Sequence, residues 1–189
     1  MRSVVSASGE SRPPQPSLTS LLVRVFTALV LGYASYNLLT LNLKPIFDTY
    51  IPLVAPFKSL AIVGGFLYVF WVSLSHRLCG RGFGVVTALA AVSMCLLTAP
   101  WYGVTSPYYY SVFGLASFLA MGILTEYLNG GFGNLACLLI NWVSAYAYNV
   151  AKVSLIGVLA LVPVAFASGL AGDYAARGLY RIVSKWIRF

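Results

Sequence analysis

Six apolar stretches, each close to the length that a helix needs to cross a lipid bilayer, follow one another along this chain. A transmembrane helix needs about 20 predominantly apolar residues, and somewhat fewer where flanking side chains reach the interface. The sequence therefore predicts an all-α fold, a polytopic bundle of about six transmembrane helices. The predicted spans are residues 18–40, 59–75, 83–99, 111–128, 135–151 and 153–172.

Charged side chains are too few to cover a soluble surface. Lys and Arg number 12 and Asp and Glu number 4, which makes 8% of the chain, against about 25% in soluble domains. Hydrolysis by paired carboxylates, a histidine-rich metal site and a Ser-His-Asp triad need residues that this chain does not bring together. We therefore expect a membrane protein that is not an enzyme. The acidic residues and the single histidine are Glu10, Asp48, Glu126, Asp173 and His76.

The three cysteines, Cys79, Cys95 and Cys137, form neither a CxxC pair nor a metal-ligand spacing. Cysteines inside apolar runs usually pack as small hydrophobic residues. We expect that role here, with no cofactor and no metal.

Basic residues set the expected orientation, because cytoplasmic loops carry the excess of Lys and Arg. With the N-terminus inside, only Lys44, Lys58 and Lys152 lie outside, and an even number of spans places both termini in the cytoplasm. This predicts a multi-pass protein of the plasma membrane and requires no nucleic-acid partner. The expected regions are a disordered cytoplasmic tail (1–17), a six-helix membrane domain (18–175) and a basic cytoplasmic C-terminal segment (176–189). The nine basic residues expected inside are Arg2, Arg12, Arg24, Arg77, Arg81, Arg177, Arg181, Lys185 and Arg188.

Two connections are expected on the outer side. Residues 41–58 carry three prolines and are too apolar for a free loop, so we expect them to pack on the bundle as a lid. Residues 100–110 are rich in aromatic side chains and suggest a cap over an outward-facing cavity.

Asparagines and aromatic residues near the outer ends of the spans form the candidate ligand site. Buried amides in lipid are costly unless paired, so these asparagines are expected to face protein or a cavity. An aromatic belt is the alternative for the tyrosines and Trp101, whereas stacking on a flat heterocycle would use the same rings. The candidate substrate-binding residues are Tyr36, Asn37, Trp101, Tyr102, Tyr108, Tyr109, Asn141, Tyr146, Asn149 and Glu126.

Glu126 is the one acidic residue within a predicted span, and an intramembrane carboxylate is by default a candidate for function. The alternative is a hydrogen-bonded position near the inner end of its helix. Asp173 and Arg177 form an i,i+4 pair, for which we expect a structural role. Ala28 and Gly32 have the four-residue spacing that lets membrane helices approach closely, either within this bundle or against a second membrane subunit.

The stretches ALVLGYASYNLL (28–39), FLYVFWVSLSHRLCGRGFGVVTALAA (66–91) and FGLASFLAMGILTEYL (113–128) carry a family resemblance. The chain resembles the substrate-binding (S) components of energy-coupling-factor vitamin transporters, and within them the thiamine-precursor, YkoE-like branch. It departs from that family in having one glycine before the carboxylate of AMGILTE and no proline in the turn HRLCGRG.

The resemblance implies a subunit that captures a vitamin or vitamin precursor from outside, with a thiamine-related pyrimidine or thiazole favoured. A separate membrane coupling subunit and two ATPase subunits would power uptake, and Ala28 and Gly32 would contact the coupling subunit. The chain itself contains no G-x-x-x-x-G-K-[ST] motif. Two alternatives remain: a structural or assembly protein that docks partner helices, and a membrane enzyme in which Glu126 and His76 meet at the cytoplasmic face.

Overall fold

The computed structural model describes residues 17–38, 43, 63–98, 109–149 and 154–186. These residues form six α-helices and one π-helix and contain no β-strand, so the expectation of an all-α fold is confirmed. The N-terminal tail, most of the 41–58 connection and the 100–108 part of the predicted cap lie outside the described residues. The elements are α1 (Leu18–Tyr36), α3 (Gly65–Cys79), α4 (Phe83–Thr98), η4 (Tyr109–Gly114), α5 (Leu115–Tyr127), α6 (Gly130–Ala147) and α7 (Leu155–Val183).

Two of the described helices, α1 and α7, are long and apolar enough to cross a membrane. Two further apolar helices, Phe83–Leu97 and Val112–Tyr127, are shorter. Helix length and composition therefore support two of the six expected spans. Helix α7 runs without a break to Val183, so the boundary expected after residue 175 falls inside one continuous helix.

Short polar side chains mark where several helices begin. Ser17 accepts a hydrogen bond from the backbone N–H of Ser20 at the start of α1, and Ser154 accepts one from Gly157 at the start of α7. Asn129 accepts hydrogen bonds from the N–H groups of both Gly131 and Phe132 at the start of α6. Such caps satisfy N–H groups that have no partner within the helix.

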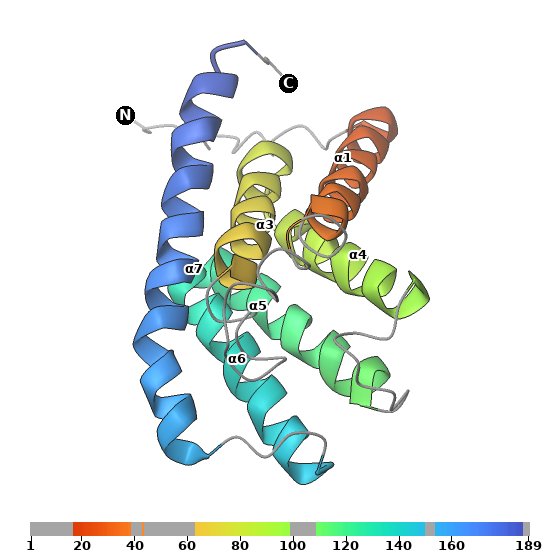
Figure 1. The fold of residues 1–189 in the computed structure, drawn as a ribbon. Helices are drawn as coiled ribbons and strands as arrows, with labels where there is room; N and C mark the ends of the chain where they lie inside the picture. Colours follow the sequence, from red (N-terminus) through yellow and green to blue (C-terminus); the bar gives the residue numbers. More distant parts are fainter. Residues whose placement is uncertain (1–16, 39–42, 44–62, 99–108, 150–153, 187–189) are drawn as a thin grey trace, which may run out of the picture.

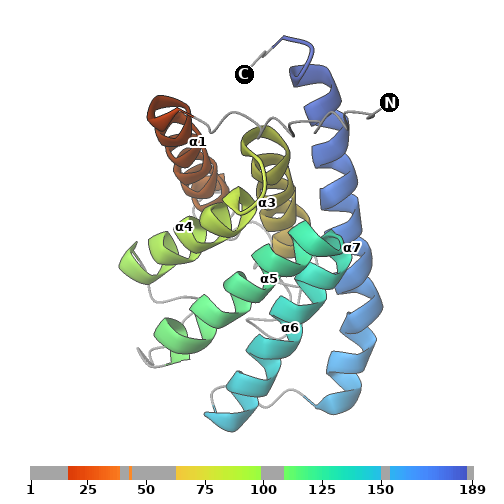
Figure 2. The ribbon, with the colours of Figure 1, turned by 180° about the vertical axis from the view of Figure 1, so that it is seen from behind.

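The start of α1 and the end of α7 lie at the same end of the molecule (Figures 1 and 2). The α3–α4 turn lies at this end as well, because the Arg24 guanidinium on α1 donates to the carbonyl oxygen of Cys79 at 3.2 Å. That turn contains Gly80 and Gly82 at φ 103° and 90°, values that favour glycine. We call this end the inner end and the opposite end the outer end.

Small residues hold α7 against α3 and α6. A Cβ atom added to Gly169 would lie 2.2 Å from the carbonyl oxygen of Gly130, and one added to Gly172 would lie 2.3 Å from that of Phe66. The Asn134 amide of α6 donates to the carbonyl oxygen of Ala165 at 2.7 Å. The three backbones therefore approach as closely as glycine permits.

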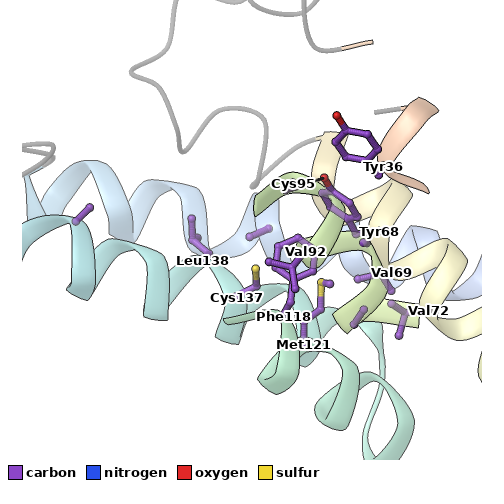
Figure 3. Close-up of a cluster of buried hydrophobic side chains, with 14 residues drawn as sticks. Tyr36, Tyr68, Val69, Val72, Val92, Cys95, Phe118, Met121, Cys137 and Leu138 are labelled. Carbon is purple, nitrogen blue, oxygen red and sulfur yellow. Dashed lines mark hydrogen bonds between the residues drawn. The ribbon is translucent and has the colours of Figure 1, made fainter. Parts of the chain in front are cut away.

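The core lies between all six α-helices, with Ala165 as the contribution of α7, and contains large aromatic side chains (Figure 3). The ring of Tyr68 meets the ring of Phe118 edge-on, with centroids 4.9 Å apart, and its hydroxyl lies 3.8 Å from Cys95 Sγ. Cys79, Cys95 and Cys137 are buried and form no disulfide with one another, so the expectation that they pack as small hydrophobic residues is confirmed.

Candidate functional site

The residues predicted to bind a ligand are distributed over the two ends of the bundle. Trp101, Tyr102 and Tyr108 lie outside the described residues. Tyr109 begins η4, and its side chain lies outside the described part. Tyr36, Asn37, Asn141, Tyr146 and Asn149 lie on α1 and α6 toward the outer end, whereas Glu126 lies at the inner end.

Tyr36 and Asn37 end α1 at the edge of the core. The Tyr36 side chain is 3% exposed and belongs to the same buried cluster as Tyr68 and Cys95 (Figure 3). The Asn37 side-chain amide donates to the carbonyl oxygen of Tyr33, one turn earlier, at 3.1 Å. Tyr36 is therefore a packing residue, and Asn37 has a partner within its own helix.

The asparagines of α6 also have structural partners. Asn141 is buried, and its amide donates to the carbonyl oxygen of Cys137 at 2.8 Å. Asn149 has a φ of 55° just past the end of the helix, and its backbone N–H donates to the carbonyl oxygen of Tyr146 at 3.1 Å. Asparagine is the commonest residue after glycine at such helix ends.

These contacts correct one step of the sequence argument. Membrane asparagines were expected to require a cavity or a neighbouring helix, because an unpaired amide in lipid is costly. One N–H of each side-chain amide of Asn37 and Asn141 instead donates to a carbonyl oxygen four residues earlier, and helix termination accounts for Asn149. The asparagines alone therefore do not define a ligand pocket.

Aromatic side chains do gather where α6 ends. The rings of Trp142 and Tyr146 lie 6.3 Å apart, and the ring of Tyr148 lies 5.2 Å from that of Phe113 in η4. Tyr146 and Tyr148 are exposed. We call the pair of Trp142 and Tyr146, four positions apart on one face of α6, the outer aromatic cluster, whereas Tyr148 and Phe113 form a separate pair. Tyr146 is the residue that the sequence singled out as a ligand residue.

Glu126 caps a helix at the inner end. Its carboxylate accepts hydrogen bonds from the backbone N–H of Gly82 at 2.8 Å and of Val85 at 3.2 Å. These groups open α4, where free N–H groups and the helix dipole favour a negative charge. The Glu126 side chain is 1% exposed. The structure therefore places Glu126 in the hydrogen-bonded position at the inner end that was the alternative, and its contact with a ligand stays a prediction.

His76 lies beside this carboxylate, with 3.7 Å between Nδ1 and the nearer Glu126 oxygen. The two residues that the enzyme alternative required to meet are therefore neighbours. His76 Nδ1 is buried and has no hydrogen-bond partner within the described residues. The described part of the chain also contains no group of three His, Cys, Asp or Glu residues that could hold a metal ion.

Asp173 is the centre of a second buried polar group at the inner end. Its carboxylate accepts from Arg77 at 3.0 Å, from Arg177 at 2.8 Å and from the Ser73 hydroxyl at 2.5 Å. The i,i+4 pair with Arg177 is confirmed. Sequence reasoning missed Arg77, which lies 96 positions earlier on α3. The one signal for this contact was the prediction that Arg77 and Arg177 lie on the same side of the membrane.

Ala28 and Gly32 pack inside this chain. Both are buried: the Thr87 hydroxyl of α4 donates to the Ala28 carbonyl oxygen at 3.0 Å, and a Cβ on Gly32 would lie 2.6 Å from that of Ala90. This corrects the expectation of a docking face for a coupling subunit in favour of the packing alternative. Beside this contact lies an open, apolar groove of about 510 Å³, lined by Leu29, Tyr33, Val86, Leu89, Ala90, Ser93 and Met94.

The geometry thus comprises an exposed outer aromatic cluster and two buried polar groups at the inner end. No protein-family model, no curated protein and no solved structure matches this chain.

Proposed function

We propose that this protein is a membrane-embedded, six-span subunit that captures a small aromatic molecule at its outer end. In this proposal it is the S component of an importer of the energy-coupling-factor type in the plasma membrane, with both termini in the cytoplasm. The ligand is a vitamin or vitamin precursor, with a thiamine-related pyrimidine or thiazole favoured. A membrane coupling subunit and two ATPase subunits supply the energy, and the chain itself has no catalytic role.

The observation that carries the proposal is the confinement of charged side chains to one end of the described helices. Among the described residues, the charged side chains lie toward the inner end, on the first half of α1, the α3–α4 turn, the end of α5 and the last third of α7. The described outer halves carry no charged residue, whereas aromatic side chains occur at both ends. Confinement of charge to one end is the distribution that the positive-inside rule requires of a membrane protein.

Exposed apolar side chains support membrane embedding. Soluble monomers rarely present large continuous apolar patches, whereas α1 and α7 expose apolar residues along most of their length. Residues 155–172 of α7 carry no charged residue at all. The large exposed apolar residues on the two helices include Leu18, Leu21, Leu22, Val23, Phe26, Leu29, Val30, Leu155, Ile156, Leu159 and Val164.

The outer aromatic cluster supports ligand capture. Flat heterocycles bind between aromatic faces, and a cationic ring such as a thiazolium gains cation–π attraction as well. Tyr146 is 66% exposed and lies next to Trp142, so its ring is available for stacking.

A thermal-shift screen of the detergent-purified protein tests the proposal. The panel contains B vitamins and their pyrimidine and thiazole precursors, and a ligand at 100 times its Kd stabilises the fold by about 2.7 kcal/mol. We expect one class of heterocycle to raise Tm, and Tyr146→Ala to reduce that shift. The matched control is Tyr127→Ala, which removes a tyrosine of similar exposure (60%) at the inner end and is expected to keep the shift.

A structural or assembly role is the second candidate, favoured by the apolar groove between α1 and α4. A well-folded preparation that shows no shift across the whole panel would contradict ligand capture and favour this role. Retention of a small aromatic molecule through purification would argue the other way, because a scaffold has no reason to retain one.

A further inference from the structure

The end of α7 extends past the buried polar group around Asp173. The helix continues to Val183, and hydrogen-bonded turns follow it through Trp186, whose backbone N–H donates to the carbonyl oxygen of Val183 at 2.9 Å. We call residues 174–186 the α7 extension. Figures 1 and 2 show the end of α7 projecting beyond α3 at the inner end of the molecule.

One strip of the α7 extension is apolar and exposed. Residues three and seven positions apart lie on the same face of a helix, which places Leu179, Ile182 and Trp186 together. Their exposed fractions are 37%, 60% and 85%. The strip therefore becomes progressively more exposed toward the end of the chain.

The adjoining strip is cationic. Arg181 and Lys185 are four positions apart and both exposed, so they lie on one face beside the apolar strip. The α7 extension contains no Asp or Glu. Asp173 is already bound by Arg77 and Arg177, Glu126 caps α4, and the remaining acidic residues, Glu10 and Asp48, lie outside the described residues.

We propose that the α7 extension is a binding surface for anionic phospholipid headgroups of the inner leaflet. Arg181 and Lys185 contact lipid phosphates while Ile182 and Trp186 enter the boundary of the acyl chains. Tryptophan favours this depth, and a spanning helix longer than the hydrocarbon core is thick reaches it by tilting. Adjoining apolar and cationic strips are typical of helices that contact a membrane surface. Each cation near an anionic surface contributes about 1 kcal/mol, or roughly fivefold in affinity. The inference rests on the membrane embedding in the proposed function and not on ligand capture.

Fluorescence quenching of Trp186 by brominated lipids tests this surface in the full-length protein. Trp71, Trp101 and Trp142 are replaced by Phe, and the protein is reconstituted into phosphatidylcholine bilayers containing equal amounts of brominated phosphatidylcholine or brominated phosphatidylglycerol. We expect stronger quenching by the brominated phosphatidylglycerol. That preference is expected to weaken with added salt, which screens exposed charges.

Two double variants distinguish lipid binding by Arg181 and Lys185 from an effect of the net charge of the whole protein. Arg181→Gln with Lys185→Gln is expected to lower the preference for anionic lipid by about 25-fold, two factors of roughly five. Arg2→Gln with Arg12→Gln removes the same charge from the N-terminal tail and is expected to leave the preference unchanged. Equal quenching of Trp186 by the two brominated lipids, in the protein that keeps Arg181 and Lys185, would overturn the proposal.

A second tryptophan reporter tests membrane embedding, on which the proposed function depends, separately from lipid binding by the α7 extension. Phe26→Trp places the single tryptophan on the exposed face of α1, where Phe26 is 69% exposed, and Trp186 becomes Phe. If this reporter is quenched by both lipids while Trp186 is quenched by neither, the lipid surface is wrong and membrane embedding stands. If neither reporter is quenched, membrane embedding is wrong as well.

Discussion

Glu126 and Gly82 are joined by a 2.8 Å hydrogen bond from a backbone N–H to a carboxylate, although 44 positions separate them. The bond ties the end of α5 to the start of α4. Nearby, the Arg81 guanidinium lies 4.4 Å from the ring centroid of Tyr127. Arg81 and Gly82 of the α3–α4 turn therefore contact Tyr127 and Glu126 at the end of α5. These contacts connect the α3–α4 turn to the end of α5. Glu126, the one acidic residue within a predicted span, serves as a helix cap.

We expect Glu126→Ala to lower the free energy of unfolding by about 1–2 kcal/mol, because loss of a helix cap leaves the N–H groups of Gly82 and Val85 without this partner. Denaturant titration of the purified protein in detergent measures the change. Glu126→Gln keeps one accepting oxygen and should recover part of the loss. A Glu126→Ala protein as stable as the parent would show that the cap is not needed.

Arg77 and Arg177 are expected to contribute unequally to the buried group around Asp173. Their side chains are 26% and 41% exposed, and solvent weakens the more exposed pair. Arg77 also joins two helices, whereas Arg177 belongs to the same helix as Asp173. Double-mutant cycles with Asp173→Asn, Arg77→Gln and Arg177→Gln should therefore give the larger coupling energy for Arg77. A larger coupling energy for Arg177 than for Arg77 would contradict this prediction.

Two glycines of α7 should respond to alanine in opposite directions. A Cβ on Gly169 would lie 2.2 Å from the Gly130 carbonyl oxygen, whereas one on Gly178 meets nothing within 4 Å. We expect Gly169→Ala to cost about 1–3 kcal/mol through overpacking and Gly178→Ala to stabilise the helix by about 0.5–1 kcal/mol. Denaturant midpoints of the two variants provide the measurement. Similar values for both would show that α6 and α7 are less tightly packed than described.

Asn149 permits a test that separates backbone strain from ligand contact. At a φ of 55°, glycine is unstrained, whereas alanine costs about 1–2 kcal/mol. Asn149→Gly should therefore keep the Tm of the free protein, and Asn149→Ala should lower it. If the side-chain amide contacts the ligand, both variants also lose ligand-induced stabilisation. A ligand shift that survives in Asn149→Gly would leave Asn149 with its helix-ending role alone.

Features that depend on neighbours along the chain were predictable from the sequence. The apolar runs indicated an all-α fold, and the i,i+4 spacing indicated the pair of Asp173 and Arg177, because helix geometry alone brings such residues together. The apolar surroundings of the cysteines indicated their burial for a similarly local reason. The described helices confirm these three predictions.

Features that depend on which helix faces meet were decided by the tertiary structure. Ala28 and Gly32 could serve an internal or an external contact, and only the position of α4 shows that the contact is internal. His76 and Glu126, like Arg77 and Asp173, are far apart in sequence and meet because the end of α3 lies beside both the end of α5 and the part of α7 around Asp173. A carboxylate or a small residue has the same sequence signature whether it caps a helix, packs a core or faces a ligand. The physical difference lies in the partner, and only the folded chain brings that partner within reach.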